Sequence, residues 1–176
     1  MLTKFKMFAV VAVAAMALTG CAKEETSMSI NDLPGRAKVK GVVCYSDREE
    51  YDDYEGKLEQ IYARKAEVKV LAKIRNSSIS NGQGHGYTIF ETVTDIAGRY
   101  EFEIPVPEDG GVTVELEALS FEGERKVFDY DYDANYDPIY NRIEGVYGFA
   151  TGTVRLEPND IKDKLLRYSF TANDEI

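Results

Sequence analysis

The feature that most constrains the fold is a repeated alternation of apolar and polar residues with a period of two. In residues 66–74, Val68, Val70 and Ile74 would face one side of an extended strand, while Lys69 and Lys73 would face the other. No stretch repeats apolar residues at the spacing of a long amphipathic helix. The alternation therefore predicts an all-β protein, a single antiparallel β-sandwich of about seven strands with loop insertions. Comparable runs lie at residues 37–46, 87–94, 99–106, 112–118, 126–130, 146–156 and 165–170.

The segments between these runs contain turn and loop signals. Residues 87–94 and 99–106 are expected to pair as a hairpin, because Asp95 can cap the connecting turn and Gly98 can adopt a positive φ. Six acidic residues lie between Asp47 and Glu55, so residues 47–64 are expected to form a loop with at most a short helix. A tight return is expected at Gly123.

The N-terminal residues have the pattern of a secretory signal. Lys4 and Lys6 precede an uncharged run, residues 7–18, which is too short to span a bilayer. This pattern predicts a signal peptide over residues 1–20. The sequence that follows, Leu18-Thr19-Gly20-Cys21, resembles the bacterial lipobox, which implies cleavage before Cys21 and acylation of that cysteine. An ordinary secretory signal with an incidental cysteine is the alternative.

The residues after the cysteine bear on location. Lys23-Glu24-Glu25 is similar to the export signal with which some Bacteroidetes move lipoproteins to the outer face of the outer membrane. The resemblance implies a lipid-anchored outer-membrane protein that faces the cell exterior, whereas a plain polar tether is the alternative. Residues 21–35 are then the lipidated N-terminus and tether, and residues 36–176 form the sandwich domain.

The charge of the chain restricts its partners. The formal net charge is −10, and removal of residues 1–20 would take away two lysines and no acidic residue. Such a chain repels phosphate backbones and anionic lipid headgroups, so no nucleic acid is expected as a partner. Basic proteins and calcium remain compatible with an acidic chain.

If Cys21 is acylated, Cys44 has no intramolecular disulfide partner, and we expect Cys44 to be a small buried apolar residue.

One motif resembles a known family. The stretch TVTDIAGRYEFEIP is similar to the carboxypeptidase-regulatory-like, transthyretin-like family, and KVKGVV and KAEVKV are similar to strands that precede the motif in that family. The resemblance implies a transthyretin-like or immunoglobulin-like sandwich that serves as an accessory, adhesive or stalk-like scaffold without catalytic residues. Ile96-Ala97, the insertion at residues 47–64 and everything after Phe128 depart from the pattern. The matching residues are Thr92, Thr94, Asp95, Gly98, Arg99, Tyr100 and Phe102.

From about residue 128 the chain becomes an extension rich in tyrosine and aspartate. Asp129, Asp131 and Asp133 are weak calcium candidates, since alternate carboxylates on a loop can surround one ion. The spacing does not match an EF-hand, because Ala134 and Tyr140 stand where glycine and glutamate are needed. The favoured interpretation is a strand whose aspartates face solvent. In that strand Phe128, Tyr130 and Tyr132 would pack inward.

The same segment supplies the candidate contact residues for a protein or glycan partner: Tyr130, Tyr132, Tyr136 and Tyr140. No nucleophile motif is present and His85 is the only histidine, so we expect no catalytic residues, no enzyme activity and no cofactor other than the weak calcium candidate. The sequence favours a surface-anchored, non-catalytic binding, adhesion or assembly module. A glycan-binding accessory lipoprotein of a polysaccharide-uptake system is the alternative.

Overall fold

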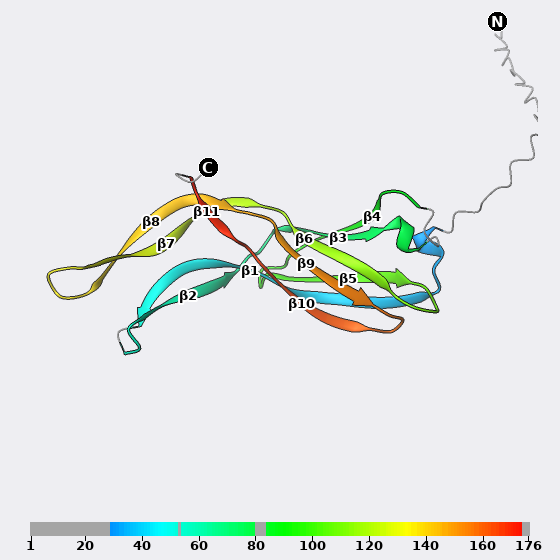
Figure 1. The fold of residues 1–176 in the computed structure, drawn as a ribbon, viewed down its shortest axis with the longest axis horizontal. Helices are drawn as coiled ribbons and strands as arrows, with labels where there is room; N and C mark the ends of the chain where they lie inside the picture. The colour runs from blue at the N-terminus through cyan, green and yellow to red at the C-terminus, as the bar shows by residue number, and fades with distance from the viewer. Residues whose placement is uncertain (1–28, 53, 80–83, 174–176) are drawn as a thin grey trace, which may run out of the picture.

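The computed structural model describes residues 29–52, 54–79 and 84–173, which form two β-sheets (Figure 1). Within these residues there is no α-helix, and the only helical segments are the short 3₁₀ turns η1 (Ile30–Asp32) and η2 (Asn76–Ser78). The prediction of an all-β fold is confirmed, but the strand number is eleven rather than about seven. The strands are β1 (Gly35–Asp52), β2 (Lys57–Arg64), β3 (Lys69–Arg75), β4 (Tyr87–Val93), β5 (Arg99–Val106), β6 (Val112–Ala118), β7 (Phe121–Tyr132), β8 (Pro138–Tyr147), β9 (Ala150–Leu156), β10 (Ile161–Arg167) and β11 (Phe170–Ala172).

The two sheets are not closed into a barrel, and they differ in how they are organised. The smaller sheet has the order β4-β3-β6-β9 and is antiparallel throughout. The larger sheet has the order β10-β1-β7-β8-β11, and both β2 and β5 also pair with β1. Its pairs of β1 with β10 and of β1 with β7 are parallel, so the expectation of a purely antiparallel sandwich is wrong for this sheet.

One core lies between the sheets. It contains the fully buried residues Val39, Ile104 and Leu166 of the larger sheet and Ile74 and Leu116 of the smaller one. These side chains come from the apolar positions of the period-two runs, and each contributes roughly 1.5–3 kcal/mol when it is removed from water.

The packed structure begins before Arg36, although order was expected to start near that residue. Ile30 is the first residue of the η1 turn, Leu33 follows the turn, and both are buried in the core. The Ser29 hydroxyl and the Asp32 carboxylate cap this turn, which fixes the entry of the chain into β1.

The turn between β4 and β5 has the predicted Asp95 cap and the predicted positive φ at Gly98, but it does not connect two paired strands. Asp95 Oδ1 accepts hydrogen bonds from the backbone N–H groups of Ala97 and Arg99, each at 2.8 Å, and Gly98 has a φ of 68°. The expected hairpin is wrong, because β4 pairs with β3 in the smaller sheet and β5 pairs with β1 in the larger one. The turn therefore carries the chain from one sheet to the other.

Two further expectations are wrong. Residues 47–64 are not a loop, because β1 continues to Asp52 and then pairs antiparallel with β2. Gly123 makes no return, since β7 runs through it without interruption. A Cβ at Gly123 would lie 3.3 Å from the Tyr147 ring, so the glycine allows this ring to pack closely.

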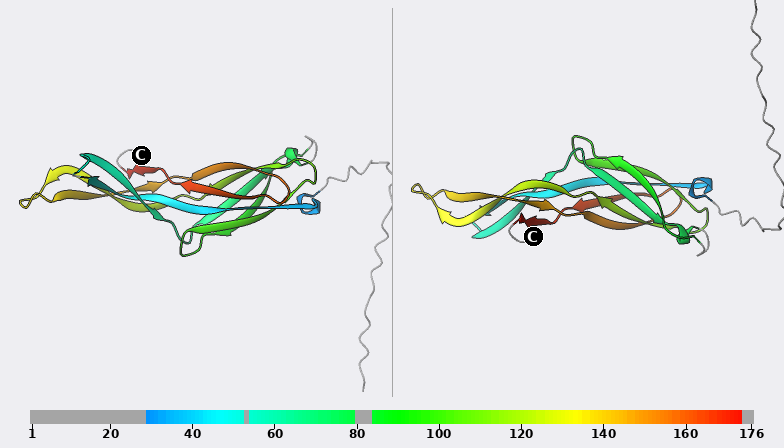
Figure 2. Two further views of the ribbon diagram at one scale, coloured as in Figure 1. Left: turned by 90° about the horizontal axis from the view of Figure 1, so that it is seen from below. Right: turned by 90° about the horizontal axis from the view of Figure 1, so that it is seen from above.

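The molecule is elongated (Figures 1 and 2). The β7–β8 hairpin and the outer half of the β1–β2 hairpin project beyond the two-sheet body at one end, whereas η1 lies at the opposite end. One end of the described structure is therefore formed by the η1 turn, which is packed against the core, and the other end is formed by the two projecting hairpins.

We expect Gly98→Val to lower the free energy of unfolding by more than about 1 kcal/mol, because valine is strained at a positive φ. A Cβ at this position would also lie 2.9 Å from the Arg64 Cβ and 3.0 Å from the Val43 carbonyl oxygen. Denaturant unfolding measures the change. Gly148→Ala is the matched control, because its added Cβ meets only the Ser169 carbonyl oxygen at 3.9 Å. Equal midpoints for Gly98→Val and the wild type would contradict the turn assignment.

Candidate binding surface

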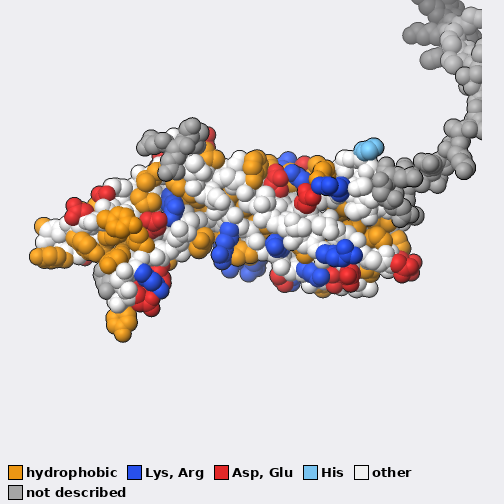
Figure 3. Space-filling model, in the orientation of Figure 1, with side chains coloured by type: hydrophobic (Ala, Val, Ile, Leu, Met, Phe, Trp, Pro, Cys, Tyr) orange, Lys and Arg blue, Asp and Glu red, His pale blue; other side chains and the backbone are white. Residues whose placement is uncertain are grey.

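The projecting ends of the two hairpins form the candidate surface. We call this region the hairpin tip, defined as residues 128–140 of the β7–β8 hairpin together with Tyr51 and Tyr54 of the β1–β2 hairpin. Hydrophobic side chains gather at this end of the molecule in the space-filling view, with acidic side chains among them (Figure 3). The surface is unlike the rest of the larger sheet, whose buried apolar side chains face the core.

A polar junction fixes the two hairpins to each other below the tip. Arg125 and Glu49 form an ion pair at 2.6 Å, with only 14% and 20% of their side chains exposed. The second oxygen of Glu49 accepts a bond from the Phe128 backbone N–H at 3.4 Å. The Tyr147 hydroxyl donates to the Ser46 carbonyl at 2.7 Å, and burial raises the pKa of Tyr147 to about 12. These contacts join β1 to β7 and β8 where the sheet leaves the core.

An aromatic cluster extends this connection into the tip. Phe128 is its centre. The Tyr51 ring stacks on the Phe128 ring, with 5.1 Å between the ring centres and an interplanar angle of 17°. The rings of Tyr130, Tyr132 and Tyr140 also pack against the Phe128 ring, with distances between ring centres of 5.1, 5.9 and 5.8 Å. The Tyr140 hydroxyl accepts a hydrogen bond from the Tyr51 backbone N–H at 3.2 Å. Three of the four predicted contact tyrosines, Tyr130, Tyr132 and Tyr140, are therefore joined through this cluster to a second hairpin.

The backbone of the tip turns two tyrosines outward. The β7–β8 register shifts between Phe128 and Tyr132, and Tyr130 adopts a φ of 55° within this irregularity. Tyr136 has a φ of 67° in the following turn. Their side chains are 78% and 86% exposed. The expected inward packing holds for Phe128 but is wrong for Tyr130 and for Tyr132, whose side chain is 40% exposed. Left-handed backbone at two aromatic residues is uncommon, and here it places both rings in solvent.

The aspartates of the tip shape the turn. Asp133 Oδ1 accepts hydrogen bonds from the backbone N–H groups of Asn135 and Asp137 at 2.8 and 2.9 Å. These bonds favour the ionised form and hold the pKa of Asp133 below its usual value. Asp131 Oδ1 accepts from the Tyr132 backbone N–H at 2.8 Å.

The weak calcium candidates Asp129, Asp131 and Asp133 are not brought together within ligand distance. Across residues 29–52, 54–79 and 84–173, the one group of acidic side chains close enough to share an ion is Asp52, Glu55 and Glu59. The Lys57 ammonium pairs with both glutamates of that group, so it already neutralises part of their charge.

Sequence reasoning missed Tyr51 and Tyr54 because the acidic composition of residues 47–64 obscured two strands. The period-two signal is weak there, since Leu58, Gln60 and Tyr62 on one side and Glu59, Ile61 and Ala63 on the other both mix apolar and polar residues. Such an alternation carries little apolar contrast, because both faces of an outer hairpin are partly exposed.

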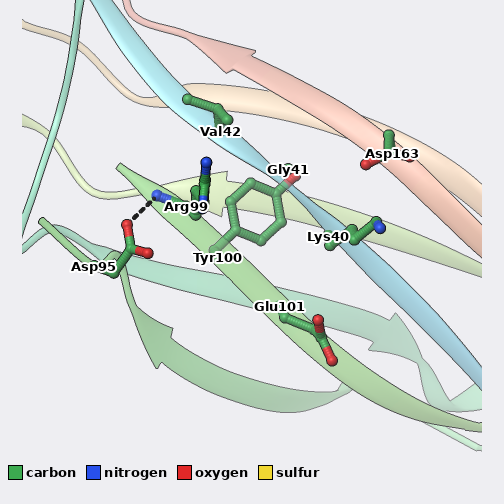
Figure 4. Close-up of a pocket in the computed structure, with 8 residues that line it drawn as sticks. All are labelled: Lys40, Gly41, Val42, Asp95, Arg99, Tyr100, Glu101 and Asp163. Atoms are coloured by element: carbon green, nitrogen blue, oxygen red, sulfur yellow. Dashed lines mark hydrogen bonds between the residues drawn. The ribbon is translucent and has the colours of Figure 1, made fainter. Parts of the chain in front are cut away.

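A second concave region lies on the larger sheet, away from the tip (Figure 4). Its volume is about 510 Å³, and Tyr100 stands in it beside Gly41. The Tyr100 hydroxyl donates to the Lys164 carbonyl at 2.6 Å, while Asp95 bonds the backbone of Arg99. Burial raises the pKa of Tyr100. The Tyr100 bond links β5 to β10, the two strands that flank β1, whereas the Asp95 bond is local to its turn. The lining residues are Lys40, Gly41, Val42, Asp95, Arg99, Tyr100, Glu101 and Asp163.

The remaining candidate residues are placed as follows. Cys44 is buried, which confirms its predicted role as a core residue, and burial raises its pKa. His85 is exposed. The predicted signal peptide, Cys21 and Lys23-Glu24-Glu25 lie outside the described residues.

No protein-family model matches the chain, and no curated protein matches it either. Across the described residues, no helix has the length and apolar character needed to cross a membrane.

We expect Phe128→Ala to loosen the tip, because Phe128 is only 5% exposed and touches four tyrosine rings. The free energy of local opening should fall by about 3 kcal/mol, which native-state hydrogen exchange of the β7 and β8 amides measures. Tyr54→Ala is the control, since its side chain is 98% exposed and should change stability by less than about 0.5 kcal/mol. Unchanged exchange in Phe128→Ala would mean that the cluster does not hold the tip.

Proposed function

We propose that the protein is a surface-anchored lipoprotein that acts as a non-catalytic binding, adhesion or assembly module. In this proposal the sandwich-like body is a transthyretin-like or immunoglobulin-like spacer, and the hairpin tip makes the contact. The lipid on Cys21 holds the chain to the outer membrane with the domain facing the cell exterior.

The observation that carries the proposal is the position of the exposed tyrosines. Tyr54, Tyr130 and Tyr136 lie on the hairpins that project from one end of the body, while η1, where the described chain starts, lies at the other end (Figures 1 and 2). An anchor on the N-terminal side would therefore leave the tip directed away from the membrane. Solvent-exposed aromatic rings at such a position are typical of recognition surfaces, since they bury large apolar area at low cost in side-chain entropy.

The lipid anchor is supported by the sequence alone, through the uncharged run that ends in Leu18-Thr19-Gly20-Cys21. Several acyl chains on one cysteine hold a protein stably, because each buried methylene contributes about 0.8 kcal/mol. The acidic composition supports the view that the protein does not bind nucleic acid or anionic lipid headgroups through its surface.

Glycan binding is the second candidate, and the exposed faces of Tyr130 and Tyr136 favour it, because sugar rings pack against aromatic faces. Tyr136 contacts no other ring among the described residues, so the tip does not present a continuous row of stacked tyrosines. We therefore place a protein partner first.

Cys21→Ala should release the protein from membranes into the soluble fraction, because acylation needs the cysteine thiol. Fatty-acid labelling of the wild type and of the variant measures this directly. Protease added to intact cells should degrade the wild-type domain if it faces outward. A wild-type protein that takes up no fatty acid would remove the anchor from the proposal, and full protection from protease would remove the outward orientation.

A tip variant tests the contact surface. Tyr130→Asn/Tyr136→Asn removes two exposed rings, and asparagine tolerates the left-handed backbone at both positions. Affinity capture of the native lipidated protein should recover a partner with the wild type and at least about tenfold less of it with the variant. Tyr87→Asn, on the exposed side of β4, is the control and should capture as the wild type does. Equal capture by all three proteins would place the contact elsewhere.

A further inference from the structure

The hairpin tip differs from the rest of the molecule in its charge balance. Residues 127–141 contain four aspartates and no lysine or arginine. Asp129, Asp131, Asp133 and Asp137 are exposed, and none of them forms an ion pair with any described residue. Elsewhere on the same hairpins several acidic side chains are paired, with Glu49 on Arg125, Glu50 on Arg48 and Glu124 on Arg142, whereas Glu122 and Glu144 form no ion pair with a described residue. The tip thus combines four carboxylates that lack an ion pair with the absence of any lysine or arginine over residues 127–141.

The aromatic rings of the tip are interleaved with these carboxylates. Tyr130 stands between Asp129 and Asp131 in sequence, and Tyr136 precedes Asp137. Both rings are exposed, and the Tyr130 ring packs against the buried Phe128, which holds the aromatic cluster together. A ligand that covers the tip therefore meets ring faces and carboxylates over the same area.

This pairing of groups fits a cation better than other ligands. A guanidinium or ammonium group is attracted to the face of a tyrosine ring and forms charge-assisted hydrogen bonds with a neighbouring carboxylate. The same contact is already made at the base of the tip, where the Lys126 ammonium lies 4.2 Å from the centre of the Tyr140 ring. Arginine suits the site best, because its planar group stacks on rings and is more weakly hydrated than an ammonium.

Resting on the proposed function, which makes the tip the contact surface, we propose that the tip binds a partner-protein segment rich in arginine or lysine. The four aspartates supply charge complementarity, and Tyr130 and Tyr136 supply the faces on which the cationic side chains lie. A neutral glycan would use the rings but leave the carboxylates without partners. A second copy of this chain meeting tip to tip would bring like charges together, which is destabilising.

The experiment uses the full-length lipidated protein in nanodiscs of neutral phosphatidylcholine, so that lipid charge does not attract the probe. The probe is a fluorescent peptide of alternating arginine and glycine, and the matched peptide has citrulline at every arginine position. Citrulline keeps the planar shape but lacks the charge. Binding is measured by fluorescence anisotropy at low and at high salt. We expect the arginine peptide to bind, the citrulline peptide to bind at least about tenfold more weakly, and added salt to weaken binding further.

Matched variants localise the site. Asp129→Asn/Asp137→Asn removes two charges while keeping the Asp133 cap, and Glu108→Gln/Asp109→Asn removes two exposed charges from the β5–β6 turn. The first variant and Tyr130→Asn/Tyr136→Asn should each weaken the arginine peptide at least about tenfold, and the second variant should bind as the wild type does. Equal weakening by both charge variants would overturn the proposal, because the attraction would then be general. An unaffected tyrosine variant would overturn it as well.

Two further readouts separate this proposal from the one on which it rests. If no arginine peptide binds but a glycan array gives binding that Tyr130→Asn/Tyr136→Asn abolishes, the cationic partner is wrong and the tip remains the contact surface. If sedimentation shows self-association that the same variant abolishes, the tip is an interface between copies and the cationic partner is again wrong. If peptide, glycan and self-association are all independent of the tip, both proposals fail together.

Discussion

The structure depends on one long strand whose backbone is shared between two regions. β1 runs from Gly35 to Asp52 and pairs along one edge first with β5 and then with β2. Along its other edge it pairs with β10 and makes a single bridge to β7 at Arg48. Its first half carries Val39 and Val43 into the core, and beyond Ser46 its residues lie outside the core. Pairing on both edges holds the first half of β1 within the body, whereas its outer part is paired with β2 on one edge and joined to β7 on the other only by the bridge at Arg48.

Where β1 leaves the core, the larger sheet is no longer stabilised by apolar side chains buried between the two sheets, and other contacts hold its strands together. These contacts are the Glu49–Arg125 pair, the Tyr147 hydroxyl on the Ser46 carbonyl, and a series of ring contacts around Phe121. Because Glu49 and Arg125 are largely shielded from water, removal of one partner would leave a charge with little solvation. The junction is therefore specific as well as stabilising, since it fixes β1 against β7 and β8 in one register.

Rigidity at the junction gives the tip its properties as a surface. Phe128 is packed by four tyrosines, so the exposed Tyr130 ring rests on a packed aromatic cluster. Tyr130 and Tyr136 are held outward by left-handed backbone, and Asp133 caps the turn between the strands. A surface that is ordered before binding loses little conformational entropy when it binds. Less of the interaction free energy is then offset, so even a small contact area can bind a partner.

The sequence by itself determined where most strands lie, which face of each is buried, that Cys44 is in the core, and how Asp95 and Gly98 form their turn. These are local properties, since a period of two and a turn geometry are set by adjacent residues. Only the tertiary structure decided which strands pair, and so placed β4 and β5 in different sheets and joined residues 47–64 to the Tyr130 hairpin. It also decided that Tyr130 faces solvent, because the register shift opposite β8 reverses the side that alternation assigns. Pairing and register depend on contacts between residues far apart in the chain, and no local pattern contains that information.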